Sequence, residues 1–352
     1  MSEQKLNGVS IKDLGLKDLP LTAKDFATDQ EVRWCPGCGD YAILKTIQKF
    51  MPSLGLPKEK SVFISGIGCS SRFPYYMNTY GFHTIHGRAP SVATGVKLAN
   101  PELDVWVVTG DGDGLSIGGN HMLHVLRRNV NLNILLFNNE IYGLTKGQYS
   151  PTSAPGLKTP SSPDGSLDLP LSPGAFALGA GARFIARSID TEMKHLTSVL
   201  GHAHGHNGAS FVEILQNCPI YNDGIFDKVK DKKTAHDNRL ILEDGEPLVF
   251  GQDNQKGLKL NTQTLAFEIV TIGEGGISIE DISKHKQSNK IAAQMLLDVD
   301  LETFPTPLGV IYHAPEKAYV DQVYAQRIEV QEEKGKPDMN LLLRSGHTWS
   351  VD

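Results

Sequence analysis

Short apolar runs alternate with amphipathic segments through the first two thirds of the chain. Four predominantly apolar runs predict buried strands at residues 61–64, 105–108, 134–137 and 211–215. Helical spacing or helical composition predicts helices at 41–51, 91–98 and 121–126. Strands that alternate with helices are typical of an α/β fold, and we expect a doubly wound sheet.

The remaining segments carry weaker patterns. Residues 149–174 are rich in Pro, Ser, Thr and Gly, so we expect little regular structure there. A long loop in a compact domain is a plain linker or part of a functional site, and we favour an active-site wall. Beyond residue 242 the sequence becomes polar and charged, with a possible short strand at 270–277. The predicted division is an N-terminal arm (1–30), a main domain (31–240) and a C-terminal extension (241–352) that contacts a partner subunit.

Composition and charge narrow the class of protein. The 352 residues suffice for one large α/β domain with extensions, and they carry a net charge of -6. No long basic stripe is present, so the electrostatic pattern of a nucleic-acid-binding protein is missing. No stretch approaches a membrane span, and residues 1–30 lack the pattern of a signal peptide. We therefore expect a cytoplasmic protein whose four cysteines do not form structural disulfides.

The segment 110–114 (GDGDG) has the composition of a phosphate-binding turn. Gly110 ends a predicted strand, and Gly112 lets the backbone approach phosphate oxygens that a Cβ atom would exclude. Asp111 lies between them, and Asn139 follows the next predicted strand 28 residues later. Carboxylate, amide and phosphate oxygens suit the octahedral shell of Mg²⁺. The pattern predicts a metal-bound diphosphate, and its alternative is a glycine-rich turn in another doubly wound fold.

Each of the four cysteines falls at the end of a predicted element. Cys35 and Cys38 lie in a CPGC turn, and Cys69 and Cys218 each follow a predicted strand. Since the ends of parallel strands meet at one edge of a sheet, four thiolates can converge there. The spacing alone leaves a [4Fe–4S] cluster, structural zinc, a redox dithiol in the CPGC turn and unligated thiols all open.

Six segments, in this order, resemble the β subunit of the 2-oxoacid:ferredoxin oxidoreductases, specifically the 2-oxoglutarate type. They are 34–39 (WCPGCG), 66–71 (GIGCSS), 83–88 (HTIHGR), 110–114 (GDGDG), 138–148 (NNEIYGLTKGQ) and 217–219 (NCP). GDG followed by NN is similar to the thiamine diphosphate signature. The resemblance covers about residues 30–230 and implies a doubly wound thiamine diphosphate-binding domain of the diphosphate type, followed by a C-terminal extension.

The resemblance also implies cofactors and the residues that hold them. Asp111 and Asn139 would bind Mg²⁺ through their side chains, and Ile141 would bind it through its carbonyl. The four cysteines would hold a [4Fe–4S] cluster, which accepts electrons from the oxidation of a thiamine-bound 2-oxo acid. The further cofactor-binding residues expected are Cys69, Ser70, Gly110, Gly112, Asp113, Tyr142 and Thr145.

Five residues are candidates for contact with the substrate. The guanidinium of Arg72 suits the distal carboxylate of a dicarboxylic 2-oxo acid, with a surface salt bridge as the alternative role. His83 and His86 are candidate catalytic groups because imidazole titrates near neutrality, and either could simply pack. Leu144 and Lys146 follow the metal ligands and are expected to shape the pocket for a longer acid.

A partner is implied by what the chain lacks. Thiamine enzymes activate the cofactor with a glutamate from a pyrimidine-binding domain, and the sequence shows no second domain of this kind. The resemblance therefore implies an α subunit that carries this glutamate and most of the coenzyme A site, in an αβ or α2β2 heteromer. The complex would convert 2-oxoglutarate and coenzyme A to succinyl-CoA and CO2 while reducing ferredoxin, or run in the reductive direction.

Three alternatives remain beside this interpretation. The same complex could act on pyruvate or on a broad range of 2-oxo acids. The chain could instead belong to a non-redox thiamine decarboxylase with structural zinc. It could also be a non-catalytic electron-transfer or scaffolding subunit that does not bind thiamine diphosphate. Metal content and thiamine binding distinguish the last two from the favoured interpretation.

Overall fold

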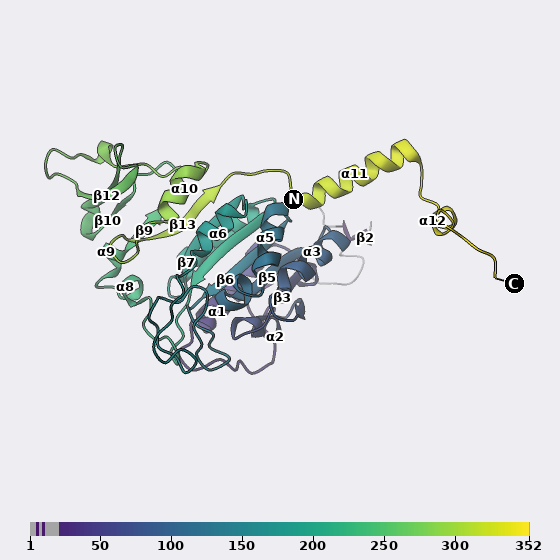
Figure 1. The fold of residues 1–352 in the computed structure, drawn as a ribbon, viewed down its shortest axis with the longest axis horizontal. Coiled ribbons are helices and arrows are strands. Elements are labelled where there is room, and N and C mark those ends of the chain that lie inside the picture. The colour runs from purple at the N-terminus through teal and green to yellow at the C-terminus, as the bar shows by residue number, and fades with distance from the viewer. Residues whose placement is uncertain (1–4, 7–8, 11–20, 352) are drawn as a thin grey trace.

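The computed structural model describes residues 5–6, 9–10 and 21–351 of the chain. Much of the N-terminal arm predicted at 1–30 therefore lies outside the described residues. Within it, the short strands β1 (Lys5–Leu6) and β2 (Val9–Ser10) pair antiparallel. Figure 1 shows a twisted sheet covered by helices, from which helix α11 projects.

A mixed sheet forms the centre of the fold, and in the described chain its strands lie in the order β4-β3-β5-β6-β8-β7-β13-β9. Their bounds are β3 Ser61–Ser65, β4 Tyr80–His83, β5 Asp104–Gly110, β6 Leu132–Asn138, β7 Phe184–Ile189, β8 Ala209–Leu215, β9 Arg239–Leu242 and β13 Thr306–His313. The strands from β4 to β7 in this order are parallel, and β13 is antiparallel to β7. The predicted doubly wound α/β class is confirmed.

Helices cover both faces of this sheet because successive strand residues point to opposite sides. Val107 and Leu136 belong to the core on one face, whereas Trp106 and Leu135 belong to the core on the other. The first face is covered by α3 (Ala89–Ala99), α5 (Gly119–Arg128), α6 (Pro173–Gly179) and α10 (Lys290–Leu297), and the second by α1 (Asp40–Phe50) and α7 (Met193–Gly205). The three predicted helices are observed as α1, α3 and α5.

The sequence does not predict strand β4. Its four residues are all exposed, and it lies at the edge of the sheet, where it pairs with β3. An edge strand held by backbone hydrogen bonds needs no apolar alternation, so the usual signal is missing. The motif 83–88 (HTIHGR) consequently begins with the last residue of a strand.

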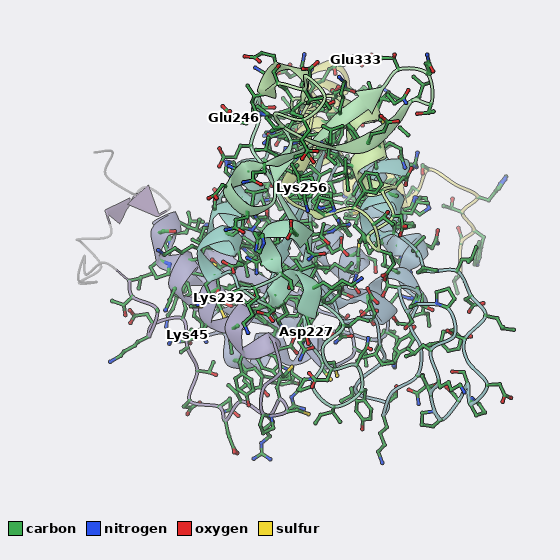
Figure 2. All side chains as sticks on the ribbon, turned by 90° about the vertical axis from the view of Figure 1, so that its left-hand side faces the viewer. Lys45, Asp227, Lys232, Glu246, Lys256 and Glu333 are labelled. Carbon is green, nitrogen blue, oxygen red and sulfur yellow. The ribbon has the colours of Figure 1, made fainter. Side chains whose placement is uncertain are left out.

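The predicted C-terminal extension contributes to the central sheet. Strand β13 lies between β7 and β9, so the sheet continues across the boundary expected at residue 240. The other elements of this region are an antiparallel sheet of β10 (Val249–Phe250), β11 (Lys256–Asn261) and β12 (Ala266–Thr271), and helices α11 (Tyr319–Lys334) and α12 (Met339–Leu343). Figure 2 shows Glu246 on this region and Asp227 on the main domain below it. None of the helices in the described residues is long and apolar enough to cross a membrane.

Candidate active site

A cavity of about 460 Å³ lies at the carboxyl ends of β3, β5 and β6. The chain adds β4 on one side of β3 and then β5 on the other, and the loops at such a reversal leave room for a ligand. Most of the predicted site residues line this cavity: Cys69, Ser70, His86, Gly110, Asp111, Gly112, Asp113, Asn139, Ile141, Tyr142, Leu144 and Thr145. Arg72, His83 and Lys146 lie outside its lining as far as residues 21–351 define it.

Asp111 is a buried carboxylate in the wall of the cavity. It begins α4 (Asp111–Leu115) directly after β5 and is only 2% exposed. Burial raises its pKa to about 6, although hydroxyl and backbone hydrogen bonds oppose this rise. The Thr152 hydroxyl donates to Asp111 Oδ2 across 2.8 Å. Among the described residues Asp111 forms no ion pair, so this buried carboxylate suits a divalent cation, which would supply a positive charge.

Asp113 also lines the cavity, but its carboxylate is occupied by the chain itself. Oδ1 accepts hydrogen bonds from the backbone nitrogens of Ile67 (3.1 Å) and Gly87 (2.7 Å), and Oδ2 accepts one from the Thr109 hydroxyl (2.7 Å). A Cβ atom at Gly66 would lie 1.9 Å from Asp113 Oδ2. Asp113 therefore ties together three segments that surround the cavity.

Gly112 allows Tyr142 to pack against the turn. A Cβ atom at Gly112 would lie 2.2 Å from Tyr142 Cε1, and the Tyr142 hydroxyl donates to the Gly112 carbonyl across 3.0 Å. The sequence predicts a glycine here because phosphate must approach the backbone. The structure gives a second reason, since the Tyr142 ring fills the space that a side chain at Gly112 would need.

The Asn138-Asn139 pair ends β6 and turns into the cavity wall. Asn139 Nδ2 donates to Gln216 Oε1 across 2.7 Å, while Asn139 Oδ1 accepts a long 3.3 Å bond from the Ile141 nitrogen. Glu140, which lies between Asn139 and Ile141, has a left-handed backbone (φ 55°) that non-glycine residues rarely adopt. Burial, with the nearby Asp111 carboxylate, raises the pKa of Glu140 to about 8. The weakly engaged amide oxygen of Asn139 and the Asp111 carboxylate, which line the same cavity, thus fit a magnesium site.

Residues 143–148 form a tight turn at the mouth of the cavity. The Gly147 nitrogen donates to the Tyr142 carbonyl, and the Tyr142 nitrogen donates to the Gln148 carbonyl, both across 2.9 Å. The Thr145 hydroxyl donates to Gln148 Oε1, so its hydrogen is engaged within the turn. Lys146 is exposed, with a backbone φ of 76°. Leu144 and Thr145 line the cavity, whereas the Lys146 side chain does not.

The four cysteines gather beside this turn. A Cβ atom at Gly143 would lie 3.5 Å from Cys218 Sγ and 3.7 Å from Cys69 Sγ, so both sulfurs approach one point. Burial and an acidic neighbour raise the pKa of Cys38, and the nearby Cys69 and Cys218 add to this rise. Burial, an acidic neighbour, Cys218 and Cys35 similarly raise the pKa of Cys69 to about 12. The CPGC turn and the two distant cysteines therefore lie in one electrostatic neighbourhood.

Hydrogen bonds hold the CPGC turn against the other two cysteine segments. Trp34 Nε1 donates to the Cys69 carbonyl across 2.7 Å, and the Gly39 nitrogen donates to the Asn217 carbonyl across 3.2 Å. Within residues 21–351, no group of three or more His, Cys, Asp and Glu side chains is close enough to hold a single metal ion. A [4Fe–4S] cluster places different sulfurs on different irons, so the looser grouping of these four thiols fits it.

Arg72, His83 and His86 differ in their position relative to the cavity. The Arg72 Nε donates to the Tyr76 hydroxyl across 3.0 Å, and its charge lies near Cys69 and His83. Burial, with the nearby Arg72, lowers the pKa of His83. His86 alone of these three lines the cavity, as far as the described residues define it.

Thr152 is a site residue that the sequence does not single out. Its hydroxyl lies 2.8 Å from Asp111 Oδ2 and 3.0 Å from Asn138 Oδ1. Asn138 Nδ2 then donates to Glu213 Oε1 across 2.8 Å, and Glu213 Oε2 accepts from Arg187 Nε across 2.7 Å. This buried network connects the loop 149–174 to the metal-ligand candidate. The only signal in the sequence is that the loop directly follows the turn.

The fold and the cavity define a thiamine diphosphate-binding domain. The family model described as "Thiamine pyrophosphate enzyme, C-terminal TPP binding domain" matches residues 66–214, which include the turns around Cys69, Asp111 and Asn139.

Relatives define the family more narrowly. The chain is 51% identical over 342 residues to the 2-oxoglutarate oxidoreductase subunit KorB of Mycobacterium tuberculosis, covering 95% of this chain and 90% of that protein. It is 45% identical over 216 residues to a 2-oxoacid:ferredoxin oxidoreductase subunit beta of Saccharolobus solfataricus, covering 61% of this chain and 69% of the relative. The chain therefore belongs to the family of 2-oxoacid:ferredoxin oxidoreductase β subunits.

A solved structure shares the fold across most of the chain. It is the 2-oxoglutarate:ferredoxin oxidoreductase from Magnetococcus marinus with 2-oxoglutarate, coenzyme A and succinyl-CoA bound. The TM-score is 0.73 at 32% sequence identity, and the match covers 93% of this chain and 97% of the other. The resemblance found in the short motifs is confirmed, and it extends beyond residue 230.

Proposed function

We propose that this chain is the β subunit of a 2-oxoglutarate:ferredoxin oxidoreductase. The complex decarboxylates 2-oxoglutarate, transfers the succinyl group to coenzyme A and passes the released electrons to ferredoxin. One observation carries the proposal: Asp111, Asn139 and Cys69 line a single cavity, in a chain that is 51% identical to a 2-oxoglutarate oxidoreductase subunit. The ligands in the Magnetococcus structure support the same substrate and product.

In this function Asp111 and Asn139 hold Mg²⁺ through side-chain oxygens, and Ile141 contributes its carbonyl. The burial of Asp111 and the weakly engaged amide oxygen of Asn139 support these roles. The backbone from Gly110 to Asp113 and the side chains of Ser70, Tyr142 and Thr145 enclose the diphosphate. The Thr145 hydroxyl would exchange Gln148 for a phosphate oxygen.

Thiamine diphosphate supplies the nucleophilic carbon for the 2-oxo acid, and the [4Fe–4S] cluster supplies an acceptor of single electrons. The chain's own task is to hold Cys35, Cys38, Cys69 and Cys218 beside the cavity. Gly143 supports this role because a Cβ atom there would lie 3.5 Å from the Cys218 sulfur and 3.7 Å from the Cys69 sulfur, so the two sulfurs lie close to one point.

The substrate acid is recognised at the mouth of the cavity. His86 is placed to hydrogen-bond or exchange a proton with the acid, because it lines the cavity. Leu144 forms an apolar wall there. Arg72, Lys146 and His83 lie outside the lining, so any contact with the distal carboxylate requires the assembled complex or a movement of these side chains. Of these three, Arg72 has the geometry suited to a carboxylate.

The active complex includes an α subunit that contributes the pyrimidine-binding domain and most of the coenzyme A site, in an αβ or α2β2 arrangement. Ferredoxin is the electron partner, and the reductive direction uses the same residues. We place the complex in the cytoplasm from the sequence alone. Neither a nucleic acid nor a membrane is a proposed partner.

Co-expression with an α subunit tests this function. We expect a brown complex that contains iron and reduces a low-potential dye when 2-oxoglutarate and coenzyme A are both present. Pyruvate and branched-chain 2-oxo acids serve as competing substrates, and a preference for one of them would reassign the substrate. Zinc in place of iron, or no binding of thiamine diphosphate by the complex, would contradict the proposal.

A further inference from the structure

Gln216 lies between the two halves of the candidate site. It directly follows β8 and is 1% exposed, and its backbone nitrogen donates to the Asn138 carbonyl across 2.9 Å. Its side chain contacts both a predicted magnesium ligand and a predicted cluster ligand. Gln216 Oε1 accepts from Asn139 Nδ2 across 2.7 Å, and Gln216 Nε2 lies 3.2 Å from Cys38 Sγ.

A backbone carbonyl fixes the orientation of this amide. Gln216 Nε2 also donates to the Asn217 carbonyl across 2.7 Å, and a carbonyl oxygen can only accept. The nitrogen of the Gln216 amide must therefore face Asn217 and Cys38, and its oxygen must face Asn139. Since Gln216 Oε1 can only accept, Asn139 must present its nitrogen to it. The Asn139 oxygen is thereby turned away from Gln216 and, apart from the long 3.3 Å hydrogen bond from the Ile141 nitrogen, is left for a metal.

We propose that Gln216 is a positioning residue that couples the thiamine diphosphate site to the iron–sulfur cluster: one amide orients Asn139 toward Mg²⁺ and donates an N–H···S bond to Cys38. The inference rests on the proposed function, because it needs both cofactors in the assembled complex. Gln216 belongs to none of the six motif segments and does not line the cavity that the described residues form, so it has no role in the proposed function so far.

The two ends of the amide have separable effects. Hydrogen bonds to cluster sulfurs are among the factors that set the reduction potential, because they stabilise the added negative charge of the reduced state. The bond to Cys38 should therefore make the cluster easier to reduce. At the other end, a residue that orients a metal ligand typically changes metal affinity by about 10–100-fold when it is removed.

Two substitutions in the complete α–β complex test the proposal. Gln216→Leu keeps the approximate volume and removes both contacts, so we expect a more negative cluster potential and about tenfold weaker Mg²⁺-dependent thiamine diphosphate binding. Gln216→Glu, measured at a pH high enough to ionise the new carboxyl, keeps an acceptor for Asn139 but replaces the donor to Cys38 with a negative charge. Its potential should be more negative than that of Gln216→Leu, and its coenzyme affinity should lie closer to that of the natural protein.

Gln48→Leu is the matched control for the loss of a buried amide. Gln48 is 8% exposed and donates to the Tyr76 carbonyl across 3.1 Å, and it is absent from the cavity lining as described. We expect lower thermal stability in this variant with neither the potential nor the coenzyme affinity changed.

The readouts are an EPR-monitored redox titration and calorimetric binding of thiamine diphosphate with Mg²⁺. An unchanged potential, or an unchanged coenzyme affinity, in a Gln216→Leu complex with full iron content overturns the proposal. If that variant does not load its cluster, Gln216→Glu decides, and a potential equal to that of the natural protein overturns it. A natural complex without iron would instead refute the proposed function, so the two failures are distinguishable.

Discussion

The Thr152 hydroxyl donates a hydrogen bond to the Asp111 carboxylate across 2.8 Å, although the two residues are 41 positions apart. The same hydroxyl lies 3.0 Å from Asn138 Oδ1, so one side chain contacts two parts of the candidate metal site. Ser150 and Ser153 beside it are also buried. The loop 149–174 therefore folds back onto the turn that precedes it, as an active-site wall would.

This contact predicts a specific effect of Thr152→Val. Valine keeps the branched shape and removes the hydroxyl, so the Asp111 carboxylate loses an orienting donor in a buried place. We expect Mg²⁺-dependent binding of thiamine diphosphate by the α–β complex to weaken about tenfold. Thr152→Ser keeps the hydroxyl and should bind within a few-fold of the natural protein. Equal affinities of the two variants in calorimetry would show that the hydroxyl has no part in the site.

The pKa of Asp111 predicts how pH acts on the metal-free chain. Burial raises this pKa from 3.8 to about 6, so the folded state favours the protonated carboxyl. Its stabilising contribution is complete below pH 3.8 and is lost as the pH rises through about 6. The difference in free energy of unfolding between the natural protein and Asp111→Asn should change by on the order of 3 kcal/mol across this interval.

Magnesium binding has the opposite dependence because the metal needs the ionised carboxylate. We expect Mg²⁺ affinity to fall as the pH drops below about 6, where Asp111 takes up a proton. Thermal unfolding and calorimetry between pH 4 and 8 measure both effects. If the stabilities of the natural protein and Asp111→Asn changed in parallel with pH, the raised pKa of Asp111 would be contradicted.

The sequence predicts the site where local pattern and parallel topology are sufficient. Asp111 and Asn139 follow apolar runs, and parallel strands bring such ends to one edge, so their meeting could be expected. The contact of Thr152 could not, because it depends on a loop that folds back onto the site. Gln216 follows strand β8, but no local pattern specifies the hydrogen bonds of its side chain with Asn139 and Cys38.

The same limit applies to the fold. Strands β3, β5, β6 and β8 are predicted because they are predominantly apolar, whereas β4 is exposed along its whole length and gives no such signal. Strand β13 is buried, but its place between β7 and β9 is a long-range pairing that no local pattern specifies. The approach of Cys218 to Cys69 could be expected because both cysteines follow parallel strands. Only the structure shows that the two sulfurs meet beside Gly143.

Exposure and pKa predict an order of thiol reactivity. In the metal-free chain Cys35 is exposed, whereas burial raises the pKa of Cys38 and Cys69 and so keeps these thiols protonated. We expect iodoacetamide to modify Cys35 first and the other cysteines more slowly, as followed by peptide mass spectrometry. In the cluster-loaded complex all four should be protected together. Rapid labelling of Cys35 in a complex with full iron content would remove it from the ligand set.

Gly112→Ala tests the close contact with Tyr142. The new Cβ atom would lie 2.2 Å from the ring, so the ring or the turn must move, at a cost of about 1–3 kcal/mol in the free energy of unfolding. Gly112→Ala combined with Tyr142→Leu should recover part of this loss. Gly119→Ala is the control, because outside its chain neighbours and its own helix backbone no atom of the described residues lies within 4 Å of the added Cβ atom, and helix α5 favours alanine. Denaturant unfolding that gives the same cost at both glycines would contradict the packing described.

The central claim is that the cysteine cluster and the Asp111 site act as one redox unit, and EPR spectroscopy tests it most directly. Addition of 2-oxoglutarate and coenzyme A to the oxidised α–β complex, without any other reductant, should produce the signal of a reduced [4Fe–4S] cluster. The Asp111→Ala complex with the same iron content should give no signal. A silent natural complex that contains both cofactors, or an equal signal from Asp111→Ala, would contradict the account.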